Sequence, residues 1–308
     1  MMQNAAILDR SSWLQATARQ RLAGLLDPGS LQEFIGPEQR VESPHLPIFD
    51  LPMAFDDGVV VGRATLDGKP VLVAAQEGQF MGGTFGEVSG AKLVGLVRAA
   101  RDDKDLPQTI LLLLDSGGVR LQEANAGELA VAEFMRAIVQ ARCEGVAVIA
   151  LVGGKSGAFG GAGLTVGVCS RVVVSEQGRI GVSGPEVIET NKGVEEYDSR
   201  DKALVWSVCG GKNRRLIGMA DAFTEDTMEG FRAAAIEQMA LAKPLDLATL
   251  QAEQVRLTER LDRFSACEDA VSIWKAMGIE HPEAIAAMDT APFVQLVSHM
   301  KDTDHDAR

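Results

Sequence analysis

Three glycine-rich turns in the centre of this 308-residue chain hold the residues best suited to chemistry. They contain the pairs Gly82-Gly83, Gly117-Gly118 and Gly160-Gly161, and the last two pairs follow apolar runs typical of buried strands. Glycine tolerates positive φ at such turns and lets other atoms approach the backbone. The first N–H groups of a following helix have no internal partner and lie at the positive end of its dipole. The pattern predicts an anion site, including one for an anion that exists only in a transition state.

Other interpretations of these turns fit less well, apart from the simple one that they are only tight turns. Gly154-Lys155-Ser156 lacks the glycine that a phosphate-binding P-loop needs five positions earlier, where Ile149 stands. The nucleophile-elbow pattern G-x-S-x-G fails at Ala158, and all four histidines lie outside the central region. No histidines, cysteines and carboxylates have metal-site spacing, so we expect no metal. Such a centre suits a reaction that must hold negative charge on a carbonyl oxygen.

The composition is that of an acidic globular protein, with 46% hydrophobic residues, 24% charged residues and a formal net charge of −13. This charge argues against nucleic acid, which would need a basic stripe, and against an anionic membrane. The four cysteines are scattered, which excludes a zinc ribbon and disfavours a disulfide framework. The N-terminus has no apolar run of signal-peptide length, and no stretch approaches the roughly 20 residues of a membrane helix. We expect a reduced, cytoplasmic protein.

Apolar runs alternate with helical patterns between residues 58 and 174. The first two runs are joined by Asp67-Gly68-Lys69, which predicts a hairpin. The later runs have no polar face, which predicts strands buried on both sides. The alternation predicts an α/β layered core with right-handed crossovers. The predicted strands are 58–66, 70–76, 109–114, 146–152 and 172–174, and the predicted helices are 88–100, 123–142 and 162–169.

The regions on either side of this core differ from it. Residues 1–55 predict an N-terminal segment in which Ser11 or Ser12 caps a helix through Leu22, followed by an extended stretch. Residues 56–224 form the predicted core. Residues 225–308 carry apolar residues at helical spacing, which predicts C-terminal helices of the same domain.

Three motifs resemble those of acyl-CoA carboxyltransferases, which have the crotonase-like fold. Residues 115–123 (DSGGVRLQE) look like the D-S-G-G-A-R-x-Q-E signature of that family, with Val119 in place of the usual alanine. Residues 81–92, which begin with MGGTFG and end at Lys92, are similar to the segment with M-G-G-S-M-G. Residues 179–189 (RIGVSGPEVIE) are similar to I-G-x-x-G-P-x-V-I-E. The resemblance implies a crotonase-like (ClpP/crotonase) layered β-β-α core.

Within that superfamily, the chain looks most like the β subunits of biotin-independent malonate decarboxylases, in its length and in residues 121–127, 188–196, 203–206 and 210–212. This resemblance implies a carboxy-lyase subunit that pairs with a γ subunit, with the active site between them. It also implies an acyl carrier protein subunit, which holds malonate as a thioester on a CoA-like phosphopantetheine arm, and an acyl-carrier transferase subunit. No biotin would be needed.

The implied reaction removes CO₂ from the malonyl thioester and leaves an enolate, whose charge lies on the thioester oxygen. We expect the N–H groups of Gly160 and Gly161 to bind that oxygen, and Gly117 and Gly118 to shape the neighbouring wall. The remaining predicted residues contact the carrier arm or exclude water. These cofactor-binding residues are Ser116, Arg120, Gly82, Gly83, Lys92 and Phe159.

Other roles and functions remain open. Arg120 and Glu123 could simply pair at a helix start, and Tyr197, the only tyrosine, fits packing better than proton donation. A carboxyltransferase subunit of a biotin-dependent acyl-CoA carboxylase or decarboxylase would need a biotinyl partner. An enoyl-CoA hydratase or isomerase would place a carboxylate near Gly160, and residues 153–164 hold none. A non-catalytic scaffold would only dock a carrier protein.

Overall fold

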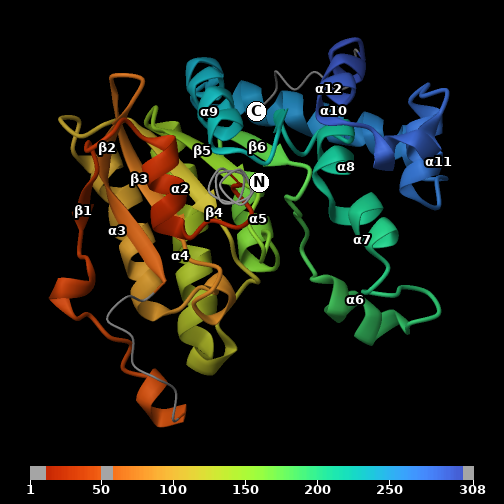
Figure 1. The fold of residues 1–308 in the computed structure, drawn as a ribbon. Coiled ribbons are helices and arrows are strands. Elements are labelled where there is room, and N and C mark those ends of the chain that lie inside the picture. The colour runs from red at the N-terminus through yellow and green to blue at the C-terminus, as the bar shows by residue number, and fades with distance from the viewer. Residues whose placement is uncertain (1–11, 50–57, 301–308) are drawn as a thin grey trace, which may run out of the picture.

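The computed structural model describes residues 12–49 and 58–300, which are built around a seven-stranded sheet (Figure 1). The strands lie in the sheet in chain order. The first three are antiparallel, and those from β3 to β7 are parallel. The α/β class expected from the sequence is confirmed. The strands are β1 Gln32–Phe34, β2 Val59–Leu66, β3 Lys69–Gln76, β4 Thr109–Leu114, β5 Ala147–Val152, β6 Arg171–Ser175 and β7 Ala222–Thr224.

The predicted hairpin and buried strands are present. Leu66 pairs with Lys69, and the two turn residues Asp67 and Gly68 have φ of 52° and 71°. Positive φ at both positions matches the right-handed twist of the strands that the turn joins. The run at 109–114 is β4, and its residues alternate between two apolar cores, one on each face of the sheet.

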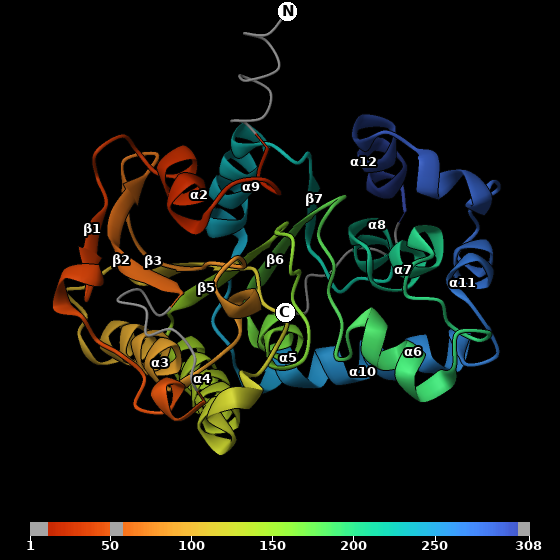
Figure 2. The ribbon, with the colours of Figure 1, turned by 60° about the horizontal axis from the view of Figure 1, so that its bottom comes forward.

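Helices cover both faces of this sheet, so the molecule has three layers (Figure 2). α3 and α4 lie on one face and α2 and α9 on the other. α6 and α7 lie beyond β6, beside the body of the molecule (Figure 1). The helices are α2 Ala18–Leu25, α3 Glu87–Asp102, α4 Asn125–Cys143, α5 Gly161–Val168, α6 Pro185–Lys192, α7 Lys202–Cys209, α8 Gly211–Leu216, α9 Met228–Leu241, α10 Leu247–Phe264, α11 Ala270–Ala276 and α12 Thr290–Ser298.

The N-terminal helix begins later than the sequence predicted. Thr17 caps α2 by accepting the Gln20 N–H, and the Gln20 side chain accepts the Thr17 N–H in return. This reciprocal pair satisfies two helix-terminal donors, which neither predicted serine would do. Ser12 instead donates to Asp226 Oδ2 at 2.7 Å, and Ser11 lies outside the described residues.

The first described residues are held by the chain beyond β7. Trp13 is fully buried and stacks on Phe231 of α9, with ring centroids 4.0 Å apart. α9 therefore belongs to the same core as the N-terminal segment, on the face of the sheet opposite α3 and α4.

A second set of pairings begins where the parallel strands end. Parallel bridges join Phe85 to Val119, Ser116 to Ala158, and Ala158 to Ile180. These residues follow β3, β4, β5 and β6, so the turns after neighbouring strands pair with one another. The second layer brings the glycine-rich turns together at the carboxyl ends of the strands, the edge where ligands bind in open α/β sheets.

Candidate active site

The turn after β4 is anchored by a buried carboxylate. Asp115 is 2% exposed, and its Oδ2 pairs with Arg21 Nη1 at 2.8 Å. Its Oδ1 accepts the Ser156 N–H at 2.7 Å. One side chain thus ties the end of β4 to α2 and to the loop after β5. Because the pair is buried on both sides, removing one member would leave an uncompensated charge.

Gly117 and Gly118 form a turn whose own amides are occupied. The Gly117 N–H donates to Gly82 O at 2.9 Å, and the Gly118 N–H donates to Ser116 Oγ at 3.2 Å. Gly118 has a φ of 124°, which a residue with a side chain rarely adopts. Ser116 and Gly82 therefore hold this turn in shape.

The turn after β5 lies directly against the turn after β4. A Cβ on Gly160 would lie 3.2 Å from Gly118 Cα, so the two glycines leave no room for a side chain between them. Gly160 has a φ of 54° and is the N-cap residue of α5. Its N–H donates to Val182 O at 3.0 Å. The structure therefore corrects the prediction that the Gly160 amide is available to a ligand.

The available amides belong to the residues that follow these two glycines. Across the ranges 12–49 and 58–300, the N–H groups of Val119 and Gly161 donate to no protein acceptor. Gly161 is the first residue of α5, where the amide has no helical acceptor. Val119 pairs with Phe85 in a parallel bridge. The Phe85 N–H donates to Gly118 O, and the Phe85 carbonyl accepts the Arg120 N–H, so neither bond uses the Val119 amide. Of the two amides predicted to bind the oxygen, those of Gly160 and Gly161, only that of Gly161 is unoccupied in the described residues.

Sequence reasoning missed Val119 as a donor and treated only its side chain. That side chain packs toward the core, where its Cγ1 would lie 2.8 Å from a Cβ on Gly127 of α4. The valine therefore fills space beside Gly127. No residue type marks a free amide, so the sequence carried no signal for this position.

Arg120 and Glu123 form a buried structural pair. Arg120 Nη1 donates to Glu123 Oε1 at 2.9 Å, and Nη2 donates to Thr84 O at 3.1 Å. Burial opposes ionisation of Glu123, but hydrogen bonds from the Glu87 N–H, Ser43 and Arg120 outweigh it and hold the pKa of this carboxyl below its usual value. Arg120 thus fixes the turn between β4 and α4 to the start of α3.

Gly82, Gly83 and Phe159 lie next to the two turns, whereas Lys92 does not. A Cβ on Gly83 would lie 1.8 Å from Asp115 O, so this backbone contact requires glycine. Phe159 is 5% exposed and directly precedes Gly160. Lys92 lies on α3 and donates through Nζ to Val59 O in β2.

Tyr197 packs behind Phe159, together with Val205 and Cys209. Its hydroxyl is buried and finds no hydrogen-bond partner in the part of the chain that the structure describes. Burial, followed by the nearby Cys209 and Glu186, raises the pKa of Tyr197. The phenol therefore stays protonated at neutral pH.

The described ranges hold neither a metal-site cluster nor a membrane-spanning helix. These contain no group of three or more histidines, cysteines and carboxylates placed to hold a metal ion. None of their helices is both long and apolar enough to span a bilayer.

Comparison with known proteins adds four findings. Residues 15–235 match the carboxyl transferase domain family. The malonyl-S-ACP:biotin-protein carboxyltransferase of Malonomonas rubra is 36% identical, over 96% of this chain and 98% of that protein. A chain in the crystal structure of a Pseudomonas malonate decarboxylase hetero-tetramer with malonate matches with a TM-score of 0.80 and 41% identity, over 89% of this chain and 99% of that one. A hetero-dimer of Pseudomonas malonate decarboxylase matches with a TM-score of 0.65 and 38% identity, over 83% and 98%.

Proposed function

The chain belongs to the carboxyl transferase family, and from this premise we propose that it is a subunit of a malonate decarboxylase that removes CO₂ from a malonyl thioester. The observation that carries the proposal is the pair of unoccupied amides, Val119 and Gly161, on two turns that touch. Two amides that donate to one oxygen suit an enolate, because its charge develops on the thioester oxygen.

The reaction breaks the bond between the carboxylate carbon and the α-carbon. The electron pair of that bond moves into the enolate, CO₂ leaves, and a proton added at the α-carbon gives the acetyl thioester. The Val119 and Gly161 N–H groups donate to the thioester oxygen while it is negative. Each donor is expected to lower the barrier by about 3–4 kcal/mol, because it is fixed before the reaction begins.

The neighbouring residues hold these donors and shape the site. Gly160 fixes the start of α5 through its bond to Val182, while Ser116 fixes Gly118. Gly117 lies against the Gly82-Gly83 turn, and we assign the entrance for the phosphopantetheine arm to that turn, which leaves backbone exposed to close approach. Phe159 lies beside Gly160 and supplies apolar surface that disfavours the charged carboxylate relative to CO₂.

A second subunit would complete the site, and we assign that role to a γ subunit. Leu121 follows Arg120 in the first turn and is 80% exposed, and Val182, the acceptor for Gly160, is 64% exposed. Gly117, Gly118, Gly160 and Gly161 line none of five cavities of about 340–570 Å³ in the described residues. These apolar side chains, which follow β4 and β6, would be buried by a partner that also encloses the substrate. The substrate arm would be carried by an acyl carrier protein, loaded by an acyl-carrier transferase subunit.

The proposal is tested by purifying the chain with a co-expressed crotonase-like partner and measuring CO₂ release from malonyl thioester on its carrier protein. We expect turnover by the pair, unaffected by avidin. A pure, folded pair that releases no CO₂ from this thioester would refute the proposal.

A second candidate is carboxyl transfer to biotin, since the name of the Malonomonas relative specifies a biotin protein as acceptor. The same two amides would then stabilise the same enolate, and the carboxyl group would pass to biotin. The avidin arm of the assay separates the two candidates, because CO₂ release that requires a biotinyl protein and is stopped by avidin supports this one.

A further inference from the structure

Arg179 follows β6 and lies beside the segment that leads to the Gly161 amide. Its carbonyl accepts the Ala158 N–H at 2.8 Å, and its Nη2 donates to the carbonyl of Lys155. Its guanidinium also lies over the ring of Phe159, with Cζ 5.7 Å from the ring centroid. One residue therefore contacts the segment before Gly161 at three places.

A second aromatic ring contacts the same guanidinium from α7. Arg179 Cζ lies 5.1 Å from the centroid of the Trp206 ring, and Trp206 Nε1 donates to Glu176 O at 2.9 Å, which fixes that ring. This distance and the one to the Phe159 ring are both within the range of cation–π contacts, about 6 Å. A planar guanidinium stacks on ring faces, whereas the lysine ammonium is a compact and strongly hydrated point charge. The position therefore favours arginine over lysine.

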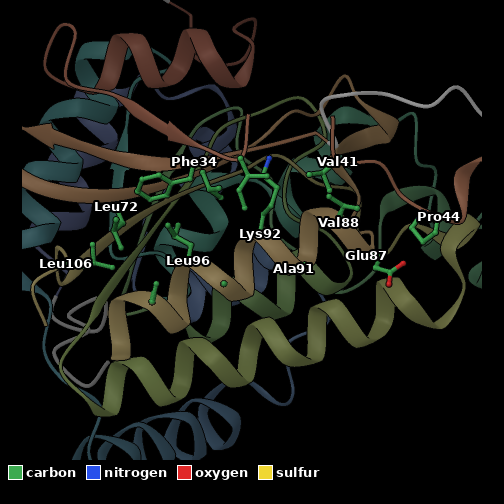
Figure 3. A pocket seen from close by; sticks show the side chains of 14 residues that line it. Phe34, Val41, Pro44, Leu72, Glu87, Val88, Ala91, Lys92, Leu96 and Leu106 are labelled. Carbon is green, nitrogen blue, oxygen red and sulfur yellow. The ribbon is translucent and has the colours of Figure 1, made fainter. Parts of the chain in front are cut away.

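Neither an ion pair nor a small-molecule cavity explains the charge of Arg179. No carboxylate pairs with it in the part of the chain that the structure describes, and its Nε is buried without a hydrogen-bond partner there. It lines none of five cavities of the described residues, among them the apolar cavity of about 450 Å³ between α3 and the strands β1 to β3 (Figure 3). Because a charged group is costly to desolvate, packing alone would suit an apolar side chain better. The contacts with Lys155, Phe159 and Trp206 therefore account for the arginine.

We propose that Arg179 is a positioning residue for the Gly161 donor, an inference that rests on the proposed function. Phe159 is joined to Gly161 through one residue, so a shift of Phe159 moves the donor. The Phe159 N–H also donates to Ser116 O at 3.0 Å, which ties this segment to the turn that carries the Val119 donor. A misplacement of about 1 Å costs an enzyme about 10²-fold in rate. Arg179 thus holds one of the two donors where the thioester oxygen requires it.

The test measures kcat and KM for CO₂ release by the assembled complex, with Arg179→Lys as the variant. We expect kcat to fall by about 10–100-fold and KM to stay within about twofold, because lysine keeps the charge and loses the stacked plane. Loss of an interaction made only in the transition state lowers kcat and kcat/KM equally. Arg263→Lys is the matched control, since Arg263 also lies over a ring, that of Phe264 at 4.9 Å, and donates to the carbonyl of Ala276. This control should keep the kcat of the unmodified complex.

A double-mutant cycle separates positioning from a merely structural role. The second change is Gly161→Pro, which removes the donor N–H, in a Val131→Ala background that makes room for the proline ring. Without the donor, Arg179→Lys should cost less than about twofold in kcat, because the group that it positions is gone. The same loss with and without the Gly161 N–H would overturn the inference, as would a folded, paired Arg179→Lys complex with unchanged kcat. Either result leaves the proposed function standing, whereas an unmodified complex that releases no CO₂ would overturn both.

Discussion

Replacing Gly161 by proline removes one backbone N–H and should leave the helix that follows intact. Proline is tolerated at the first position of a helix, where the missing N–H had no acceptor. Gly161 is that position in α5, and Gly160 before it has φ 54° and ψ −126°. The right-handed helical region, which a residue before proline avoids, is therefore not required there.

A side chain at position 161 also needs room. Its Cβ would lie 2.5 Å from Val131 Cγ2 and 2.9 Å from Val131 Cγ1. If Gly161→Val alone lost activity, the loss could come from this clash rather than from a change at the amide. Both test variants therefore carry Val131→Ala, which removes these two atoms at a cost of about 1–2 kcal/mol of stability. Gly161→Ala in this background keeps the N–H and is the matched control for Gly161→Pro.

We expect the proline variant to lose about 10²–10³ in kcat, the effect of removing one oxyanion donor. The alanine control should stay within about tenfold of Val131→Ala, since its donor is unchanged. The assay is CO₂ release from the malonyl thioester by the complex, with the melting temperature and partner co-purification measured for both variants. Equal activity of two folded variants would refute the assignment of the Gly161 amide.

Three further predictions concern the surroundings of the site. Asp115→Asn leaves the Arg21 charge buried without its counter-ion, and should lower the free energy of unfolding in urea by about 3–5 kcal/mol; a loss below 1 kcal/mol would contradict this role. Because Glu123 has a lowered pKa when folded, its contribution to stability is complete above its ordinary value of 4.5 and is lost as the pH falls further. The difference in melting temperature between the unmodified chain and Glu123→Gln should therefore shrink below that pH, and a constant difference would argue against it. Leu121→Asp should change stability by less than about 0.5 kcal/mol, since this side chain is 80% exposed, yet abolish co-purification with the partner; retained co-purification would exclude Leu121 from the interface.

The sequence predicted the layered core well, because its signals are local. The run at 110–114 has no polar residue, and its short length between turn signals predicts a strand buried on both faces. The short helices α6 to α8, of six to eight residues, were missed, since such lengths give too few turns for apolar periodicity to be recognised. α5, also of eight residues, was predicted from the alternation of strands and helices instead. The start of α2 was misplaced because Ser12 and Thr17 are both suitable caps, and the choice depends on Gln20 and on the distant Asp226.

The candidate site was predictable in outline but not in its donors. Turns after neighbouring parallel strands meet at one edge, so the glycine pairs could be expected to lie close together. Which amides remain unoccupied depends on bonds between distant residues, such as that from Gly160 to Val182. The register of Phe85 with Val119 decides the same question for the first turn. Neither pairing can be predicted from the types of the residues that form it.

Because Trp13 stacks on Phe231, the core on this face of the sheet can be completed only after residue 231 has been synthesised. Residues 13 and 231 are 218 positions apart, so at ribosomal speed about 10–40 s pass between their appearance. Through that interval the strands β2 to β6 are already made, while the sheet face that α9 will cover stays exposed. The nascent chain therefore carries an open apolar surface until its last quarter emerges, and a message truncated before α9 would yield a product prone to aggregate rather than a smaller folded domain.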